Sequence, residues 1–580
     1  MSDQGSTRSA LLLSLLAAAL FVPAALAQNP GQQHRGLPID WTSQHLLFST
    51  HASRTAAARN GATFSDPRAI HSALMHGFSL AGQARVSTPS GRAPKKPRPP
   101  RVVSQVDWSV SLGAGTVAPN MSPAKFGFDP TLASCSNDYA VFALNVPGVT
   151  GGQANLIAFN NLYSGAGSSL CGRTAPTVLF SYNVSTVGGS LLTSPIISIF
   201  GDKIIFVEST TTAAVLHRLT WHAGEGTSAT NAAVPAAVCN LDLGPCTCPS
   251  GVSCDETLTI NSTIGSTVSS PFPDYFAIND NVYVGTDDGT LYQIRGALYG
   301  TPTIAWTSPV SGGMLTGPAI LFGPPNNQTE VAVYVGDDSG NLFQVNPADG
   351  TVLHTLAVGG GFPEGGLVDA PIVDNGNATV FAFSANDGAS AVAVQADQNL
   401  NELARAPVGT SVANALTPPV NIHTGTPDDN YFTDPTTGFL YVCGTNDANT
   451  RPVLYRFGFT AGTPAPMNTV NSGTLQLAST AGVECSPLTE VFNSNITLHN
   501  DTLFLGLLGG CGSVLSPGCV RDYNITSGMP GTFLNSVNET GGTSAIIMDN
   551  VVNSPQASSI YFSTLGSSKR AVKLTQTQLN

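Results

Sequence analysis

Short apolar runs that alternate with polar residues recur along most of the chain, and two stretches are near copies of one another. The first runs Asn281-Val-Tyr-Val-Gly-Thr-Asp-Asp-Gly-Thr-Leu-Tyr-Gln-Ile294, and the second runs Val331-Ala-Val-Tyr-Val-Gly-Asp-Asp-Ser-Gly-Asn-Leu-Phe-Gln-Val345. In each, a run rich in β-branched and aromatic residues meets an Asp-Asp-Gly or Asp-Ser-Gly turn, and a second run follows. This pattern predicts a β-hairpin. A two-residue turn needs a positive φ, which Gly289 and Gly340 adopt without a Cβ clash.

A second pattern recurs at the start of each such unit. A Thr, Ser or Asp precedes a small residue, a Pro and a short apolar run, and the main instances are Thr193-Ser194-Pro195, Ser269-Ser270-Pro271, Thr316-Gly317-Pro318, Asp369-Ala370-Pro371, Thr417-Pro418-Pro419 and Cys485-Ser486-Pro487. Met121-Ser122-Pro123 and Thr543-Ser544-Ala545 are degenerate members. Pro at the first residue of a strand costs no ladder hydrogen bond. The pattern therefore predicts where the first strand of each unit begins.

Further strands are predicted inside each unit. The second strands are expected at Ala140–Val146, Lys203–Glu208, Asn281–Gly285, Val331–Gly336, Ala378–Ser384, Phe439–Cys443, Thr502–Leu507 and Ser559–Ser563. The third strands are expected at Asn155–Phe159, Ala214–Thr220, Leu291–Ile294, Leu342–Val345, Ser390–Gln395, Val453–Phe457, Cys519–Tyr523 and Ala571–Leu574. Fourth strands are recognisable at Val178–Tyr182, Thr303–Trp306 and Thr351–Leu356.

Repeated four-stranded units bury their faces by stacking radially, so the predicted fold is an all-β, eight-bladed β-propeller. The strand Val106–Val110, which contains Trp108, has no first strand before it, and the last unit runs out of chain after three strands. We expect this N-terminal strand to complete the eighth blade and close the ring. A seven-bladed ring with one misassigned unit is the alternative.

Composition changes this picture in two ways. Charged residues make up 10% of the chain, against roughly 25% in typical soluble domains. The net charge is −13, while the basic residues Arg92, Lys95, Lys96, Arg98 and Arg101 gather in one stretch, which leaves the repeat region distinctly acidic. Nucleic-acid binding requires a basic face, so we expect no nucleic-acid partner. No stretch after the first 27 residues is apolar for long enough to span a membrane.

The N-terminal 27 residues have the pattern of a secretory signal. Arg8 precedes an apolar run from Ala10 to Leu20, and Ala25-Leu26-Ala27 gives a small-x-small cleavage pattern. An uncleaved anchor is the alternative. The expected organisation is a signal peptide over 1–27, an N-terminal extension with a basic Pro-rich linker over 28–101, and the β-propeller over 102–580, in a secreted or periplasmic protein.

The extension is expected to be a pro-region or a loosely docked segment. Short helices are predicted at Trp41–Ser49 and at Asp66–Leu80, the second capped by Asp66 with Pro67 at its first position. The extension holds the histidines His34, His45, His51, His71 and His76. No two of these histidines have a convincing spacing for binding a metal ion together, so we expect them to be solvated or packed in the core.

Ten cysteines in a chain with an export signal indicate disulfide bonds. Plausible pairs are Cys135 with Cys171, Cys443 with Cys485, and Cys511 with Cys519. The remaining four, Cys239, Cys246, Cys248 and Cys254, lie in a Pro- and Gly-rich insertion. A zinc knot is one interpretation of these four, but Cys-x-Cys spacing is unusual for zinc, and we expect two disulfides.

At Ser269–Trp306 and Thr316–Thr355 the chain resembles the repeats of the pyrroloquinoline-quinone-type propellers, a family that includes quinoprotein dehydrogenases and the non-enzymatic propellers of outer-membrane assembly. The stretch Gln344-Val345-Asn346-Pro347-Ala348-Asp349-Gly350-Thr351-Val352-Leu353-His354 follows the end of the family's repeat, with His354 where a docking Trp is usual. The resemblance implies that Trp108, Trp221 and Trp306 pack between blades. In the family's enzymes a quinone and Ca²⁺ lie over the channel, beside an adjacent-cysteine disulfide, but this sequence has no Cys-Cys dipeptide.

Candidate chemistry is sparse. Asp-Asp pairs at 287–288, 337–338 and 428–429 are read as hairpin turns rather than calcium loops, because no distal carboxylate completes a ligand set. No Gly-x-Ser-x-Gly elbow indicates a serine hydrolase. Asp369 and Glu484 stand at predicted first-strand starts, near the axis, where two carboxylates can bind a cation or a polar ligand at the channel mouth. The alternative is that Asp369 only bonds the turn backbone.

The sequence therefore predicts a binding or scaffold protein with an unknown protein or glycan partner and no cofactor. One alternative is a quinone-dependent oxidoreductase that holds the quinone with Ca²⁺. Another is a polysaccharide hydrolase or lyase, for which Asp369 and Glu484 are the only indication.

Overall fold

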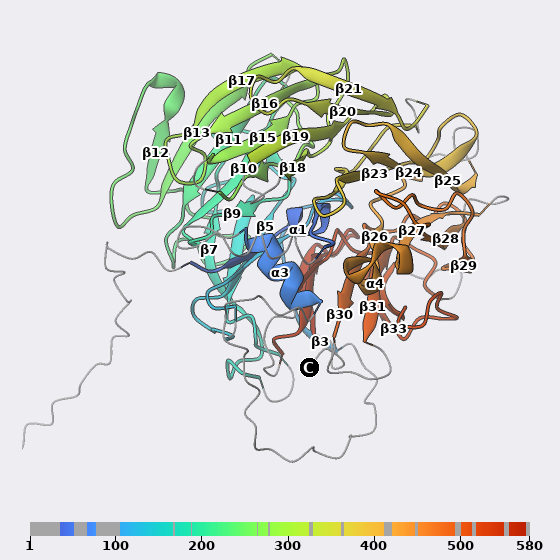
Figure 1. Cartoon of the computed structure of the whole chain (residues 1–580). Helices are drawn as coiled ribbons and strands as arrows, with labels where there is room; N and C mark the ends of the chain where they lie inside the picture. The colour runs from blue at the N-terminus through green and yellow to red at the C-terminus, as the bar shows by residue number, and fades with distance from the viewer. Residues whose placement is uncertain are drawn as a thin grey trace, which may run out of the picture. The chain divides into compact units, whose positions relative to one another are not determined.

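Eight antiparallel β-sheets follow one another around a central axis and form an eight-bladed β-propeller (Figure 1). The computed structural model describes residues 35–50, 66–76 and 105–575, with gaps at 131, 166–168, 187, 264, 277–278, 324–328, 361–364, 411–419, 447–450, 494–499, 513–517 and 550–555. The predicted signal peptide, the basic stretch from Arg92 to Arg101 and the predicted strand start at Thr417 lie outside the described residues. No helix of the described residues is long and apolar enough to cross a membrane.

Each blade runs from an innermost first strand to an outer fourth strand. Blade one consists of β4 (Ala124–Gly127), β5 (Tyr139–Ala143), β6 (Leu156–Asn160) and β7 (Thr177–Tyr182), and blade two of β9 (Ile196–Ile197), β10 (Lys203–Ser209), β11 (Ala214–Thr220) and β13 (Cys254–Asn261). Blade three consists of β14 (Phe272–Pro273), β15 (Asn281–Gly285), β16 (Thr290–Arg295) and β17 (Thr303–Pro309). Blade four consists of β18 (Ala319–Gly323), β19 (Thr329–Gly336), β20 (Asn341–Val345) and β21 (Val352–Ala357). Blade two also holds β8 (Ser190–Leu191) beside β10, and β12 (Ala237–Asn240), which runs parallel to β13.

The second half of the ring repeats this order. Blade five consists of β22 (Ile372–Asp374), β23 (Thr379–Ser384), β24 (Ser390–Asp397) and β25 (Glu402–Thr410), and blade six of β26 (Thr426–Pro427), β27 (Phe439–Thr445), β28 (Pro452–Gly458) and β29 (Gly473–Gln476). Blade seven consists of β30 (Thr489–Phe492), β31 (Asp501–Leu507), β32 (Cys519–Asn524) and β33 (Asn535–Asn538). Blade eight consists of β34 (Ile547–Asp549), β35 (Ser559–Ser563), β36 (Arg570–Thr575) and β3 (Gln105–Ser111). A short helix, α4 (Asp429–Thr433), joins β26 to β27 and is followed by the 3-10 turn η2 (Pro435–Thr437); a second 3-10 turn, η1 (Leu241–Leu243), follows β12.

The predicted closure of the ring is confirmed. β3 pairs antiparallel with β36, and Trp108 lies opposite Lys573 in that pairing. The buried Lys573 ammonium lies 2.8 Å from the Asp107 carboxylate, so an ion pair joins the two ends of the chain inside blade eight. Trp108 also donates its indole hydrogen to the Leu162 carbonyl of blade one at 2.9 Å. The seven-bladed alternative is therefore wrong.

The predicted second and third strands are found in all eight blades, and three details differ. The hairpin turn between β15 and β16 spans Thr286 to Gly289 rather than two residues, and its Gly289 has a φ of 81°. The first strand of blade six is β26, which begins at Thr426, well after the predicted Thr417. Fourth strands β13, β25, β29 and β33 had no recognisable pattern; β29 and β33 are only four residues long and none of their residues is buried, so they carry little apolar signal.

The tryptophans pack where the repeat pattern placed them. Trp306 of blade three donates to the Pro347 carbonyl of blade four at 3.0 Å. A Cβ on Gly350 would lie 2.7 Å from the Trp306 ring, so the close approach of the two blades requires glycine there. Trp221 of blade two contacts the Phe180 ring of blade one, at 5.5 Å between ring centroids.

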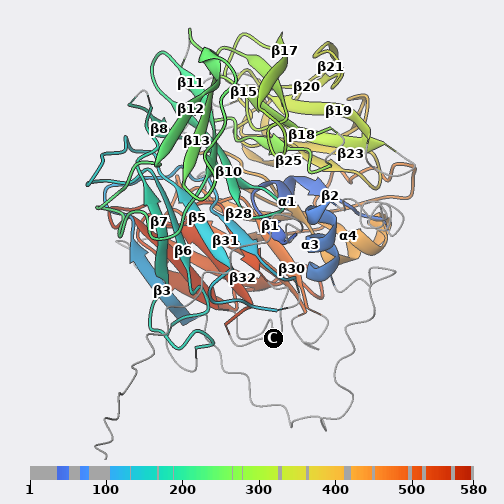
Figure 2. The same cartoon turned by 90° about the vertical axis from the view of Figure 1, so that its left-hand side faces the viewer.

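Residues 35–50 and 66–76 enter the central channel, and we name them the channel plug (Figures 1 and 2). β1 (Leu37–Ile39) pairs antiparallel with β4 of blade one, and β2 (Leu46–Leu47) pairs parallel with β22 of blade five. Between them lies α1 (Thr42–His45), and α3 (Pro67–Met75) follows. Asp66 caps α3 as predicted, with its carboxylate accepting the Arg68 backbone N–H. The expectation of a loosely docked segment does not hold for these residues, which are almost entirely buried.

Five disulfides are present; three are the predicted pairs, and the other two join the four cysteines whose pairing the sequence left open. They join Cys135 to Cys171, Cys239 to Cys246, Cys248 to Cys254, Cys443 to Cys485, and Cys511 to Cys519. The four cysteines of the blade-two insertion thus form two disulfides rather than a zinc knot. Cys443 and Cys485 lie in blade six and before the first strand of blade seven, so this bond links neighbouring blades.

Candidate functional site

One face of the propeller carries both the segments that join successive blades and the turns between second and third strands. Antiparallel strands bring these connections to the same end of each sheet, and we name this the mouth face. At its centre lies a cavity of about 240 Å³, the channel mouth. Its lining includes Asn120, Val268, Asp338, Leu367, Val368 and Asn421. These residues precede the first strands of several blades, or, for Asp338, lie in the turn after β19.

The channel plug lies next to this cavity. A smaller hollow of about 30 Å³ shares Asn120, Val268 and Val368 with the channel mouth and is lined on its other side by Trp41 and His45. Trp41 packs against Gly317, where an added Cβ would lie 2.8 Å from the indole ring. Helix α1 therefore closes the channel directly behind the mouth.

The polar atoms of the channel mouth are mostly hydrogen-bond acceptors. The Asn120 side-chain amide donates to the Val368 carbonyl at 3.0 Å. The Asn421 amide donates to Glu484, with its nitrogen 3.5 Å from the carboxylate. The Asp338 carboxylate accepts no hydrogen bond and forms no ion pair with the residues that the structure describes. The lining contains no Lys, Arg or His.

The structure brings the two predicted carboxylates, Asp369 and Glu484, to the same imidazole. His423 Nδ1 lies 2.9 Å from the Asp369 carboxylate, and Nε2 lies 2.7 Å from the Glu484 carboxylate. Asp369, His423 and Glu484 belong to the segments before blades five, six and seven, so the triad joins three blades. All three side chains are buried, at 7%, 4% and 11% exposed.

The electrostatics of this triad indicate a charged imidazolium. Burial by itself lowers the pKa of His423, but Asp369 and Glu484 outweigh it and raise that pKa to about 10. Burial likewise raises the pKa of Asp369, yet the imidazolium and the Thr424 backbone N–H leave it below its ordinary value. Both predicted carboxylates therefore pair with a cation that the chain itself supplies, the His423 imidazolium.

Sequence reasoning placed Asp369 and Glu484 near the axis but missed His423. His423 could have been found from its position in the repeat. It stands three residues before β26, just as Asp369 stands three residues before β22. Assigning the start of blade six to Thr417 hid this equivalence.

The same arrangement occurs a second time, inside one blade. His217 of β11 lies 2.9 Å from Asp255 of β13 and 3.3 Å from Glu208 of β10. Burial lowers the pKa of His217, but the two carboxylates outweigh it and raise that pKa to about 9. This second triad crosses three strands of blade two and lines none of the three cavities described here, so it belongs to the core of the blade.

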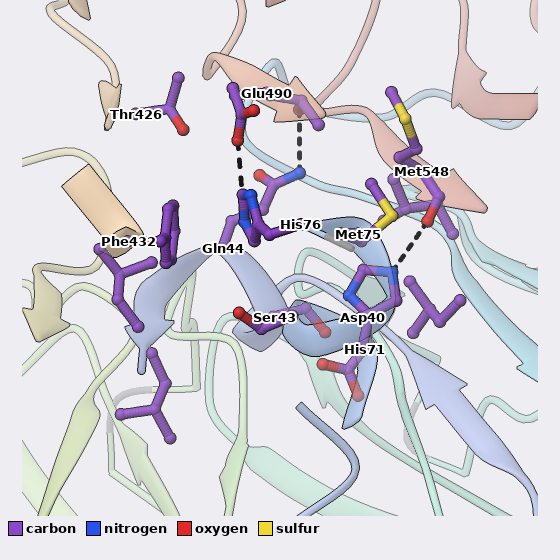
Figure 3. Close-up of a pocket in the computed structure, with 16 residues that line it drawn as sticks. Asp40, Ser43, Gln44, His71, Met75, His76, Thr426, Phe432, Glu490 and Met548 are labelled. Atoms are coloured by element: carbon purple, nitrogen blue, oxygen red, sulfur yellow. Dashed lines mark hydrogen bonds and ion pairs between the residues drawn. The ribbon is translucent and has the colours of Figure 1, made fainter. Parts of the chain in front are cut away.

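At the far end of the plug, away from the mouth, the His76 ring lies 3.8 Å from the buried Glu490 carboxylate (Figure 3). The His76 ring stacks on Phe432, with centroids 3.9 Å apart, and lies 3.0 Å from the Asp429 carboxylate. Burial raises the pKa of Asp501 to about 8, and it raises the pKa of Glu490 well above its ordinary value. A cavity of about 60 Å³ adjoins His76 and Glu490.

The Asp-Asp pairs at 287–288 and 337–338 serve as turns. Asp288 accepts the Thr290 backbone N–H at 3.1 Å, and Asp337 accepts that of Asn341 at 2.7 Å. The third pair is not a hairpin, because Asp428 caps helix α4. Among the described residues, no group of three or more His, Cys, Asp or Glu is arranged to hold a metal ion.

No family model matches the sequence, and no curated protein matches it. Among solved structures, BamB from Moraxella catarrhalis matches with 12% identity over 75% of this chain and 98% of its own, at a TM-score of 0.41. Sqt1 from Chaetomium thermophilum matches with 11% identity over 82% of this chain and 99% of its own, at a TM-score of 0.48. The WD40 propeller domain of Doa1 matches with 10% identity over 82% and 98%, at 0.37. These similarities concern the β-propeller fold alone.

Proposed function

We propose that this chain is a secreted or periplasmic binding and scaffold protein that engages a protein partner at the channel mouth of its propeller. The observation that supports this most directly is the channel plug. Its residues fill the axis behind the mouth, and they bond to the first strands around the ring.

The plug touches every blade. The Gly36 N–H donates to the Ile199 carbonyl of blade two at 2.8 Å. Trp41 donates to the Pro271 carbonyl of blade three at 3.1 Å, and Gln44 bonds Thr489 of blade seven and Ile546 of blade eight. β1 contacts blade one, and the Trp41 ring packs against Gly317 of blade four. β2 pairs with blade five, and His76 lies beside Asp429 of blade six. A channel occupied in this way leaves the mouth as the larger hollow on the axis.

The proposed location rests on the disulfides. Five of them account for all ten cysteines, and disulfides persist in oxidising compartments. The signal-like N-terminus predicts the same location.

The quinone alternative fits this mouth poorly. Pyrroloquinoline quinone is a tricarboxylate, so its site needs cationic side chains or a metal ion to balance the charge. Among the described residues that line the mouth, Asp338 is the one ionisable side chain, and it carries the same sign of charge as the quinone. Titrating the purified protein with the quinone and Ca²⁺ and recording the absorbance tests this directly. A stoichiometric bound chromophore would overturn the proposal.

A peptide selection tests the proposed binding site. Phage-displayed random peptides are selected on the whole protein and then measured against two matched variants. Val268→Trp fills the mouth from its rim, where Val268 is 38% exposed, while Val331→Trp changes an equally exposed valine that does not line the mouth. We expect selected peptides to bind Val331→Trp like the wild type and Val268→Trp at least about tenfold more weakly. Peptides that bind both variants equally, or a selection that enriches nothing, would contradict the proposal.

A further inference from the structure

We propose that the channel mouth binds an arginine side chain presented by a peptide segment of the partner protein. This inference rests on the proposed function and adds the chemistry that the mouth recognises. Three features of the mouth carry it: its hydrogen-bonding pattern, its walls and its charge.

The hydrogen-bonding pattern favours a ligand that is rich in donors, because most of the open polar atoms of the mouth are acceptors. The amide nitrogens of Asn120 and Asn421 each use one of their two hydrogens to bond Val368 and Glu484, while their amide oxygens accept nothing among the described residues. Asp338 adds two carboxylate oxygens with no partner among the described residues. An ionised carboxylate only accepts hydrogen bonds, whereas a guanidinium offers five donors and no acceptor.

Asp338 is held in place for this role. Its backbone N–H donates to the Met314 carbonyl at 3.0 Å, which fixes the turn after β19 against the segment before blade four. A Cβ on Gly313 would lie 1.9 Å from the Asp338 carboxylate, so glycine is required for the carboxylate to lie there. The repeat-equivalent residue in blade three, Asp287, is held in the same way by its backbone, since its N–H donates to the Ser266 carbonyl at 3.2 Å.

The walls suit the stem of an arginine. Val268, Met314, Leu315, Leu367 and Val368 give the mouth an apolar lining, and an arginine buries its methylene groups against such a surface while its charged end bonds polar groups. The cavity of about 240 Å³ is smaller than the roughly 300–1,000 Å³ of pockets for drug-sized ligands. One long side chain matches this size, and the exposed rim residues Val268 and Met314 are placed to contact the flanking residues of a peptide.

Charge favours a cationic partner. The turns around this part of the mouth face carry Asp287, Asp288, Asp337 and Asp338, and the lining carries no basic residue. Complementary charge raises association rates and disfavours anionic partners. The chain's own basic stretch is a less suitable occupant, because α3 ends at the opposite end of the channel, where His76 meets Asp429 beside α4. We therefore assign the mouth to a separate protein.

The experiment uses two focused phage libraries on the whole protein, with Arg or Gln fixed at the centre of otherwise random peptides. The best arginine peptide is then synthesised with arginine, lysine or citrulline at the centre. Citrulline keeps the shape of arginine and removes its charge. Each peptide is titrated into the wild type, Asp338→Asn and Asp349→Asn, the last being an exposed aspartate of the same blade on the opposite face.

We expect enrichment from the arginine library only. Citrulline, or the Asp338→Asn change, should weaken binding at least about tenfold, as expected for a lost charge-assisted hydrogen bond, while Asp349→Asn leaves it unchanged. Peptides that Val268→Trp blocks, but that bind equally with citrulline or to Asp338→Asn, would overturn this inference and leave the proposed function standing. If no peptide depends on Val268, both fail.

Discussion

Two regions follow one another along the axis of the propeller, the plugged channel and the open mouth. The first strands of the blades, and the segments that precede them, surround both regions. Inside the channel the plug is tied to the ring by polar side chains: Asp40 accepts from Tyr275 at 2.8 Å, and Ser49 donates to Asp374 at 2.6 Å, although the buried hydroxyls of Ser43 and Ser72 have no partner among the described residues. At the mouth, Asp338 has no partner among the described residues. The difference separates the two roles of the repeat, because engaged groups stabilise the ring and unengaged groups are available to a ligand.

The largest expected effect comes from removing the indole at the top of the plug. Trp41→Ala should lower the free energy of unfolding by about 3–5 kcal/mol, because it leaves a cavity and an unpaired Pro271 carbonyl. Denaturant titration measures this. Met314→Ala at the mouth, where the side chain is 39% exposed, should change it by about 0.5 kcal/mol or less. Equal effects of the two changes would erase the proposed contrast.

Breaking the triad of Asp369, His423 and Glu484 should lower the free energy of unfolding nearly as much as Trp41→Ala does. In His423→Gln, two buried carboxylates lose their shared cation, and we expect the free energy of unfolding to fall by about 3 kcal/mol. In the wild type the pKa of His423 is about 10 when folded, against 6.5 for the free group, so its stabilisation is complete below pH 6.5 and is lost as the pH rises through 10. Stability measured from pH 6 to 10 should therefore decline less in the variant than in the wild type.

A smaller effect is expected where the plug ties two blades together. Gln44→Ala removes the amide that donates to Thr489 and Ile546, and should lower the free energy of unfolding by about 1–2 kcal/mol. Gln44→Glu offers a comparison of nearly equal shape, because its oxygens cannot donate to the Ile546 carbonyl. A variant as stable as the wild type would mean that this part of the plug does not join blades seven and eight.

The acidic end of the plug should make stability depend on pH. The folded pKa of Asp501 is about 8, against 3.8 for the free group, so the folded protein holds a proton that the unfolded chain releases. The free energy of unfolding should therefore fall as the pH rises from about 4 to 8. Asp501→Asn, which keeps an acceptor for the Asp429 N–H, should flatten that profile. Thermal unfolding across this range measures it, and an unchanged slope would contradict the assignment.

The smallest effect on stability is expected at the mouth. Asp338→Asn keeps the shape of a side chain that bonds nothing among the described residues, and should change the free energy of unfolding by about 0.5 kcal/mol or less. Its effect should instead fall on binding, as described above. A destabilisation as large as that of Trp41→Ala would show that Asp338 is structural.

The contrast also explains what could be predicted from the sequence. The hairpin of β15 and β16 could be predicted because its apolar strands meet at a glycine turn. The place of the Trp108 strand in blade eight could be predicted because the last unit lacked a strand. The plug could not, since β1 and β2 are only three and two residues long and pair with strands far along the chain. The mouth was only partly predicted: Asp369 and Glu484 follow the repeat pattern, whereas the placement of Asp338 at the axis depends on how neighbouring blades meet.

Hydrogen exchange of the intact protein, followed by mass spectrometry of its peptides, tests the plugged channel most directly. Backbone amides of β1, α1 and β2 should be protected as strongly as those of the inner strand β22, to which β2 is paired. Exchange of residues 37–47 within seconds, while β22 stays protected, would show that the segment does not fill the channel and would remove the basis for confining binding to the mouth.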